Sequence, residues 1–78
     1  MDSIELLKAT AGKFGQQCKV EVSTGDIFSG IFRGYAESTP QAPLVLRLEL
    51  SHNEAERIGV GYLHSIGVPY DVIKNIQF

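Results

Sequence analysis

The sequence predicts a mainly β fold: a small, five-stranded, strongly bent antiparallel barrel with an N-terminal α-helix. Apolar residues recur with a helical period near the N-terminus, and from Gly15 onward the period changes to two. Gly30 and Gly34 then fall inside the second expected strand. A glycine within a strand usually marks a bulge, a sharp bend or a close backbone approach, and a strand that closes a small barrel must bend sharply.

The composition indicates a single domain over residues 1–78, with a formal net charge of −2 and a sequence pI of about 5.5. A chain of this length buries only about 60% of its unfolded surface, so we expect self-association to add stability. The single cysteine, Cys18, is expected to be a small buried residue in a reducing compartment. A signal-peptide pattern and a long apolar run are both missing from the sequence, so we expect a cytoplasmic protein without membrane contacts.

Residues 2–14 are predicted to form a helix. Asp2 suits the N-cap position, and Glu5, three residues later, completes a pattern like a capping box. Gly12 and Gly15 bracket the end of the helix. Apolar residues recur at spacings of three and four and form one stripe, consisting of Ile4, Leu7, Ala11 and Phe14.

The next two strands are predicted to form a hairpin. The first is half buried, because alternating apolar residues share one face: Cys18, Val20 and Val22. A tight turn at Thr24–Asp26 follows, in which Gly25 is expected to need a positive φ. The second strand is predicted over Ile27–Tyr35, and one of its faces carries Phe28, Gly30, Phe32 and Gly34.

A loop and a leucine-rich strand are expected next. Two prolines and the lack of periodicity predict a loop over Ala36–Pro43. The third strand is predicted over Leu44–Ser51. Its inward face consists of Leu44, Leu46, Leu48 and Leu50.

The remaining residues predict two more strands. A polar turn over His52–Glu56 leads to a fourth strand over Arg57–Leu63. A short connection over His64–Tyr70 then precedes the last strand, Val72–Phe78. In the fourth strand, one face is expected to carry Ile58, Val60 and Tyr62.

This order of residues resembles the Sm-like (Lsm) family, which includes Hfq-type proteins, with the chain as a divergent member. The first motif of that family has a glycine after a helix, alternating apolar residues, a polar-Gly turn, and then spaced glycines and aromatic residues. The matching positions here are Gly15, Cys18, Val20, Val22, Thr24, Gly25, Phe28, Gly30, Phe32 and Tyr35. The less specific second motif is matched by Asp71, Ile73 and Ile76. Together with the helix, the resemblance covers nearly the whole chain.

The resemblance implies a homo-oligomeric ring. In Sm-like proteins the fourth strand of one subunit pairs with the fifth strand of the next. Unpaired strand edges favour aggregation, and such pairing removes them. The interface residues that it implies here are Ile58, Val60, Tyr62, Ile73 and Ile76.

The resemblance also implies binding of single-stranded RNA in RNA metabolism, but the residues of the family's uridine pocket have changed. The Asp position is Ala36, the Asn position reads Ala42-Pro43, and the Arg-Gly pair is replaced by Pro69-Tyr70. Asp71 alone remains. Candidate RNA contacts, near Ala36–Pro43 and Pro69–Asp71, are Tyr35, Ser38, Gln41, Tyr70 and Asp71. The net charge weighs against broad electrostatic binding but permits a local pocket in which bases stack.

Other interpretations stay open. Tyr70 and Asp71 also fit an ordinary turn, in which the carboxylate caps backbone groups, and Tyr35 fits the strand pattern. The altered pocket and the acidic pI favour a second hypothesis, a protein-interaction or assembly module that has lost the RNA site. A monomeric SH3-like barrel is a third.

Catalytic and metal sites are not predicted. The sequence lacks a nucleophile–base arrangement and a phosphate-binding glycine loop, so we expect a non-enzyme without a cofactor. His52 and His64 lack the spacing of metal ligands and are expected in loops that face solvent. The arginines could form a basic track, but glutamates lie close to them in sequence, which favours a mixed, solvated surface.

Overall fold

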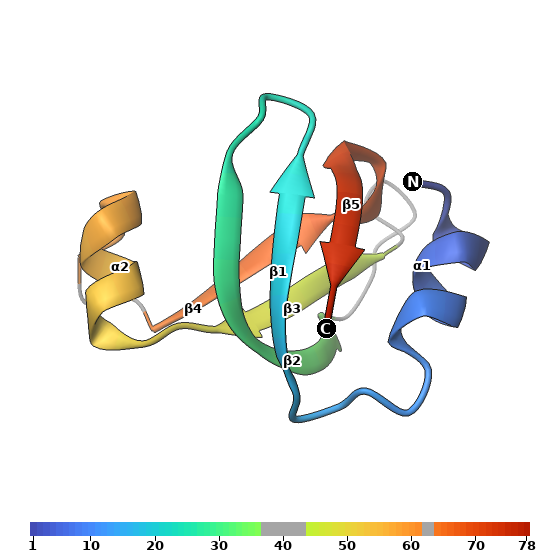
Figure 1. Ribbon diagram of the computed structural model, residues 1–78, viewed down its shortest axis with the longest axis horizontal. Coiled ribbons are helices and arrows are strands. Elements are labelled where there is room, and N and C mark those ends of the chain that lie inside the picture. The colour runs from blue at the N-terminus through green and yellow to red at the C-terminus, as the bar shows by residue number, and fades with distance from the viewer. Residues whose placement is uncertain (37–43, 62–63) are drawn as a thin grey trace.

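The computed structural model describes residues 1–36, 44–61 and 64–78 (Figure 1). Its elements, in chain order, are α1 (Ser3–Thr10), β1 (Gln17–Val22), β2 (Ile27–Ala36), β3 (Val45–Glu49), α2 (His52–Ile58), β4 (Ser65–Pro69), the 3₁₀ turn η1 (Tyr70–Val72) and β5 (Ile73–Gln77).

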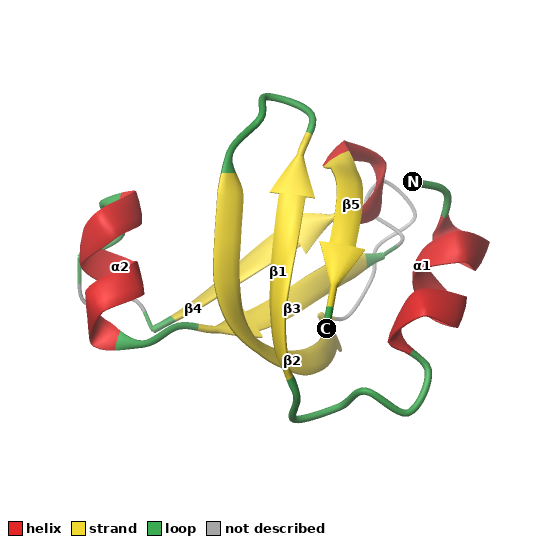
Figure 2. Ribbon diagram, viewed as in Figure 1, coloured by secondary structure: helices red, strands yellow, loops and turns green. Residues whose placement is uncertain are grey.

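The five strands form one antiparallel sheet in the order β4-β3-β2-β1-β5. The fold is therefore mainly β with an N-terminal helix, as predicted. The long strand β2 curls, so that β3 and β4 cross behind β1 (Figure 1). The sheet is bent but not closed, because β4 and β5 are its two edges, and α2 and α1 lie at opposite ends of it (Figure 2).

Two glycines shape β2, as the sequence predicted. A Cβ on Gly30 would lie 2.7 Å from the carbonyl oxygen of Glu49, so only glycine permits this approach of β2 to β3. Gly34 has a φ of 81°, and the register with β3 shifts between Phe32 and Tyr35. This shift is a β-bulge, which increases the local bend of the strand.

The core collects one face of every strand and one or two residues of each helix. The predicted inward residues Leu46, Leu48 and Leu50 are buried, and Leu44 packs against them. Cys18 is 2% exposed, and burial raises the pKa of its thiol to about 11. The prediction that Cys18 is a small buried residue is confirmed.

Helix α1 begins as predicted but ends early and turns a different face to the core. The Asp2 carboxylate accepts a hydrogen bond from the Glu5 N–H at 2.8 Å, which caps the helix. The helix stops at Thr10, so the predicted end at residue 14 is wrong. Leu6 and Thr10 are buried, whereas much of the predicted apolar stripe is exposed: Ile4 (65%), Leu7 (49%) and Phe14 (66%).

The predicted fourth strand, Arg57–Leu63, is wrong, and so is the predicted turn over His52–Glu56. Helix α2 begins after Ser51, whose hydroxyl accepts from the Glu54 N–H at 3.1 Å, and it ends at Gly59, which has a φ of 79°. The Ser51 cap and the left-handed Gly59 favour a helix more strongly than the alternating apolar residues favour a strand. Residues 62–63 lie outside the described ranges.

The fourth strand of the sheet is β4, within the segment predicted as a connection. Pro69 had suggested a loop, but it is the last residue of this edge strand and pairs with Val45. Proline is compatible with an edge, because its missing N–H is not needed there for the sheet.

Two charged residues fasten α2 to the sheet. The Glu54 carboxylate accepts a hydrogen bond from the Ser29 N–H at 3.1 Å, and the Arg57 guanidinium donates to the Ile27 carbonyl at 2.5 Å. The two side chains also pair with each other. The hydrogen bond from Arg57 lowers the pKa of Glu54, although burial opposes this shift.

Replacing Glu54 by alanine should loosen α2, at a cost of about 1 kcal/mol, because the carboxylate links the helix to β2. The folded-state pKa of Glu54 is lowered, so its stabilisation is present at neutral pH and is lost as the pH falls through that pKa. Urea unfolding at about pH 7 and about pH 3 should therefore show a gap between wild type and E54A that narrows in acid. An equal gap at both pH values would contradict this assignment. Glu56→Ala, at an exposed position of the same helix, is the control.

Replacing Gly30 by alanine should lower the free energy of unfolding by about 1–3 kcal/mol, because the new Cβ would collide with the Glu49 carbonyl. Thermal or urea unfolding would measure the change. Ser23→Ala, at an exposed position beyond the end of β1, should leave stability nearly unchanged. A G30A protein as stable as wild type would show that this close approach does not constrain the sheet.

Candidate functional site

The two segments expected to contact RNA begin at one end of the sheet. Ala36, the last residue of β2, pairs with Val45, and Val45 pairs with Pro69 at the end of β4. The Tyr70 N–H continues this ladder by donating to the Leu44 carbonyl at 3.0 Å. The structure therefore places Leu44 next to Tyr70 of η1, with Ala36 one strand further along the ladder. Ser38 and Gln41 themselves lie outside the described residues.

Tyr35 has a structural partner. Its hydroxyl lies 2.6 Å from the Thr10 hydroxyl, and its ring meets the edge of Phe32 at a centroid distance of 5.6 Å. The ring is half-buried, and burial raises the pKa of the phenol, opposed by the hydrogen bond with Thr10. Tyr35 thus ties α1 to β2, which agrees with its interpretation as a strand residue.

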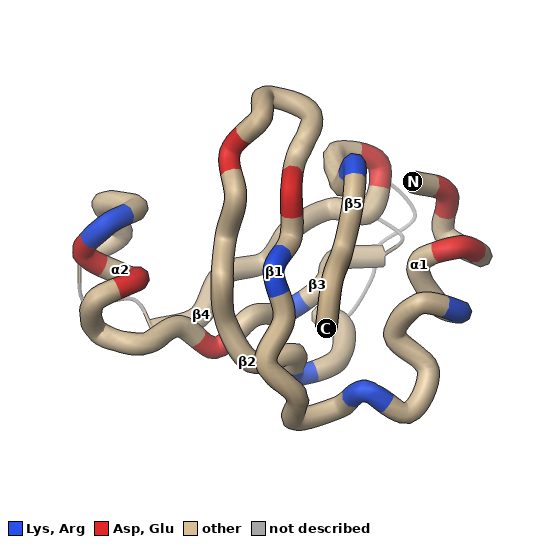
Figure 3. Tube along the Cα trace, viewed as in Figure 1, with Lys and Arg blue, Asp and Glu red and all other residues tan. Residues whose placement is uncertain are grey.

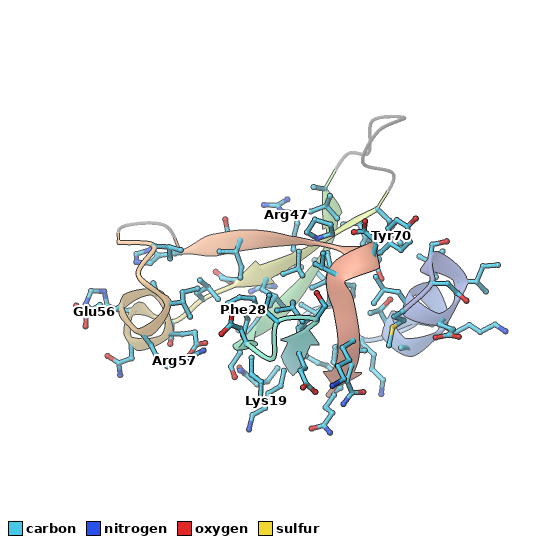
Figure 4. All side chains as sticks on the ribbon, turned by 90° about the horizontal axis from the view of Figure 1, so that it is seen from above. Lys19, Phe28, Arg47, Glu56, Arg57 and Tyr70 are labelled. Atoms are coloured by element: carbon cyan, nitrogen blue, oxygen red, sulfur yellow. The ribbon has the colours of Figure 1, made fainter. Side chains whose placement is uncertain are left out.

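Tyr70 and Asp71 lie in η1, between β4 and β5. Tyr70 is half-buried and packs against the core, whereas Asp71 is exposed. Figure 4 shows Tyr70 at the side of the molecule opposite to α2. Tyr70 and Asp71 therefore both keep exposed surface next to Leu44 and Pro69.

The predicted interface residues do not all lie on strands. Ile73 and Ile76 belong to β5 and pair with Val22 and Val20 of β1, with Ile73 buried and Ile76 half-buried. Ile58 ends α2 and Val60 follows it, so the prediction that they form an edge strand is wrong. Tyr62 lies outside the described residues.

The free edge of β4 consists instead of Ser65, Gly67 and Pro69. The Leu50 N–H donates to the His64 carbonyl at 2.6 Å, and the Tyr70 N–H donates to Leu44, so these two bonds bracket β4. Backbone groups alternate in direction along an antiparallel strand. The polar groups of residues 66 and 68 must then face β3, and those of 65, 67 and 69 must face outward.

An apolar groove of about 460 Å³ runs beside this edge. It lies between the β1–β2 turn, α2 and β4, and its apolar lining includes Phe28, Ile58, Val60, Ile66 and Val68. Ile58 and Val60 therefore contribute to a surface next to the β4 edge, although not from a strand. At the other edge of the sheet, the Met1 ammonium donates to the Ile73 carbonyl at 2.6 Å, so the N-terminal segment lies against β5.

The two histidines come close together at the surface. Their ring centroids are 6.4 Å apart, and both residues are exposed. His52 is the first residue of α2, not part of a loop, and it faces Glu56 at 3.2 Å. Within the described ranges, no three potential metal-binding side chains converge. The helices in these ranges are also too short or too polar to cross a bilayer.

Comparisons with protein-family models, curated proteins and solved structures found no match. The Sm-like resemblance thus stays a prediction from the motif residues.

Replacing Tyr35 by phenylalanine should lower the free energy of unfolding by about 1 kcal/mol, because the mutation removes the hydrogen bond with Thr10 and keeps the ring packing. The Thr10 hydroxyl keeps its bond to the Leu6 carbonyl at 2.9 Å, which limits the loss. Urea unfolding would measure the effect, with Tyr70→Phe as the matched control. If the free energy of unfolding is unchanged, the hydrogen bond between Tyr35 and Thr10 does not stabilise the fold.

Proposed function

We propose that this protein is an Sm-like, ring-forming, cytoplasmic protein that binds single-stranded RNA. The observation that carries the proposal is the open sheet. Its strand order leaves β4 at one edge and β5 at the other, five residues each. Pairing of β4 in one copy with β5 in the next would satisfy the outward backbone groups of β4 and those of β5 beyond Ile73, whose carbonyl already accepts from Met1. A repeated head-to-tail contact of this kind forms a ring when its rotation closes.

RNA contact is proposed at the end of the sheet where the two segments meet. The ladder from Ala36 through Val45 to Pro69 brings the described residues that flank positions 37–43 to the same end of the sheet as Tyr70 and Asp71. In a ring this edge would recur once per subunit. The exposed part of the Tyr70 ring could stack on a base, an interaction worth about 1–3 kcal/mol per base.

The assembly step is tested by light scattering coupled to size exclusion. Wild type should elute as one oligomer of several subunits. Ser65→Pro removes an outward N–H from the start of β4 and should shift the protein toward the monomer, whereas Ser65→Ala should not. A wild-type monomer at micromolar concentration would refute the ring.

The RNA step is tested with fluorescently labelled U-rich and A-rich oligonucleotides at low salt. Binding should weaken about 5- to 100-fold in Tyr70→Ala, as expected for the loss of one stacked base, and much less in Tyr70→Phe. If neither oligonucleotide binds wild type, RNA binding is refuted while the ring is not.

A second candidate is an assembly module without an RNA site. The hydrogen bond of Tyr35 to Thr10 favours it, since that ring is committed to packing instead of to a ligand. The apolar groove beside β4 would then receive a protein segment. An intact oligomer that binds neither oligonucleotide would favour this candidate over the first.

A further inference from the structure

Phe14 is exposed and yet held in place. Its side chain is 66% exposed. The chain directly after it is fixed to β2, because the Gly15 N–H donates to the Phe32 carbonyl at 2.8 Å and the Phe32 N–H donates to the Gln16 carbonyl at 2.9 Å. Its ring also meets the edge of Phe32 at 6.4 Å and lies over Gly34. An aromatic ring that is already immobilised loses little entropy when a ligand stacks on it.

Phe14 forms one wall of a cleft of about 480 Å³ on the outer surface of β2 and β3, next to the start of β4. The polar lining of the cleft includes two cations, Arg33 and Arg47, and one anion, Glu49. Arg33 lies 5.8 Å from the centre of the Phe14 ring and pairs with Glu49 at 2.7 Å. Arg47 adds a second guanidinium, and Figure 4 shows it on the side of the molecule away from Lys19. Because Arg33 neutralises Glu49, the three side chains leave one net positive charge.

A second exposed ring also packs against Phe32. Phe78 is 41% exposed, and its ring centroid lies 5.9 Å from that of Phe32. The Lys13 ammonium lies 5.9 Å from the centre of its ring. Figure 3 shows single basic residues on the α1–β1 connection and near the C-terminus, and acidic residues at the start of α1 and around the β1–β2 turn.

We infer that the Phe14 cleft is a second contact site for single-stranded RNA, in which Phe14 stacks on a base and Arg47 binds a phosphate. Exposed aromatic rings flanked by cations are what sequence-tolerant binding of single strands uses. The cleft is large enough for a small ligand. The inference rests on the proposed function for its ligand, but the cleft lies toward the end of β3, whereas the loop segments meet at its start.

Substitutions at Phe14 separate stacking from packing. Fluorescence anisotropy with a labelled single-stranded RNA should show binding about 5- to 100-fold weaker for Phe14→Ala. Phe14→Leu keeps apolar bulk without a π face and should lose nearly as much, whereas Phe14→Trp should retain affinity. Leu7→Ala is the control, because that side chain is also exposed but lies on α1. Circular dichroism would confirm that each variant is folded.

Arg47→Ala tests the phosphate contact. It should weaken binding at low salt and reduce the slope of log affinity against log salt by about 0.7, the value for one phosphate contact with a single strand. Lys8→Ala, on exposed α1, should leave the slope unchanged.

The results distinguish the Phe14 cleft from the proposed RNA contact at Tyr70 and Asp71. If Tyr70→Ala weakens binding and the Phe14 and Arg47 variants do not, the cleft assignment is overturned and the proposed function stands. If wild type binds no RNA, the cleft assignment and the proposed RNA binding are both wrong. If Phe14→Ala changes the oligomeric state and not the affinity, the cleft is a contact between copies of this chain and the RNA assignment is wrong.

Discussion

The bend of β2 is the constraint on which the rest of the structure depends. At Gly30 the β2 backbone approaches β3 so closely that a Cβ would lie 2.7 Å from the Glu49 carbonyl, and at Gly34 a bulge shifts the register. Between these two points the strand turns far enough for β3 and β4 to lie across β1. The cleft beside Phe14 depends on that turn, because Arg33 of β2 and Arg47 of β3 both line it.

Features of the fold could be predicted from the sequence where they depend only on neighbouring residues. The Asp2 cap, the positive φ of Gly25 and the buried leucines of β3 depend on neighbouring residues or on strict alternation, and all three are as predicted. The prediction for residues 52–60 is wrong because two local signals compete there. The Ser51 cap and the Gly59 stop define α2, but the alternating Ile58 and Val60 look like a strand when read alone.

The candidate sites depend on contacts between distant residues, which periodicity cannot supply. Tyr35 meets Thr10 across 25 positions of the chain, and this contact turned a candidate ligand residue into a structural one. Phe14 belonged to a predicted helical stripe, but the helix ends at Thr10 and leaves the ring beyond it. In the sequence, the available signal for the Phe14 cleft was an aromatic residue next to Lys13. The arginines that line this cleft, Arg33 and Arg47, come from β2 and β3.

The attachment of α2 has a consequence for motion. The helix has seven residues, of which only Ala55 is buried, and its polar links to the sheet come from the Glu54–Arg57 pair. A helix this short does not persist alone, so its folding depends on these hydrogen bonds to β2 and on the packing of Ala55 and Ile58. Local fluctuations should therefore start at α2, with amide exchange there much faster than in β1 and β2. The groove beside β4 would widen in such openings while the sheet stays intact, because Ile58 at the end of α2 forms part of its lining.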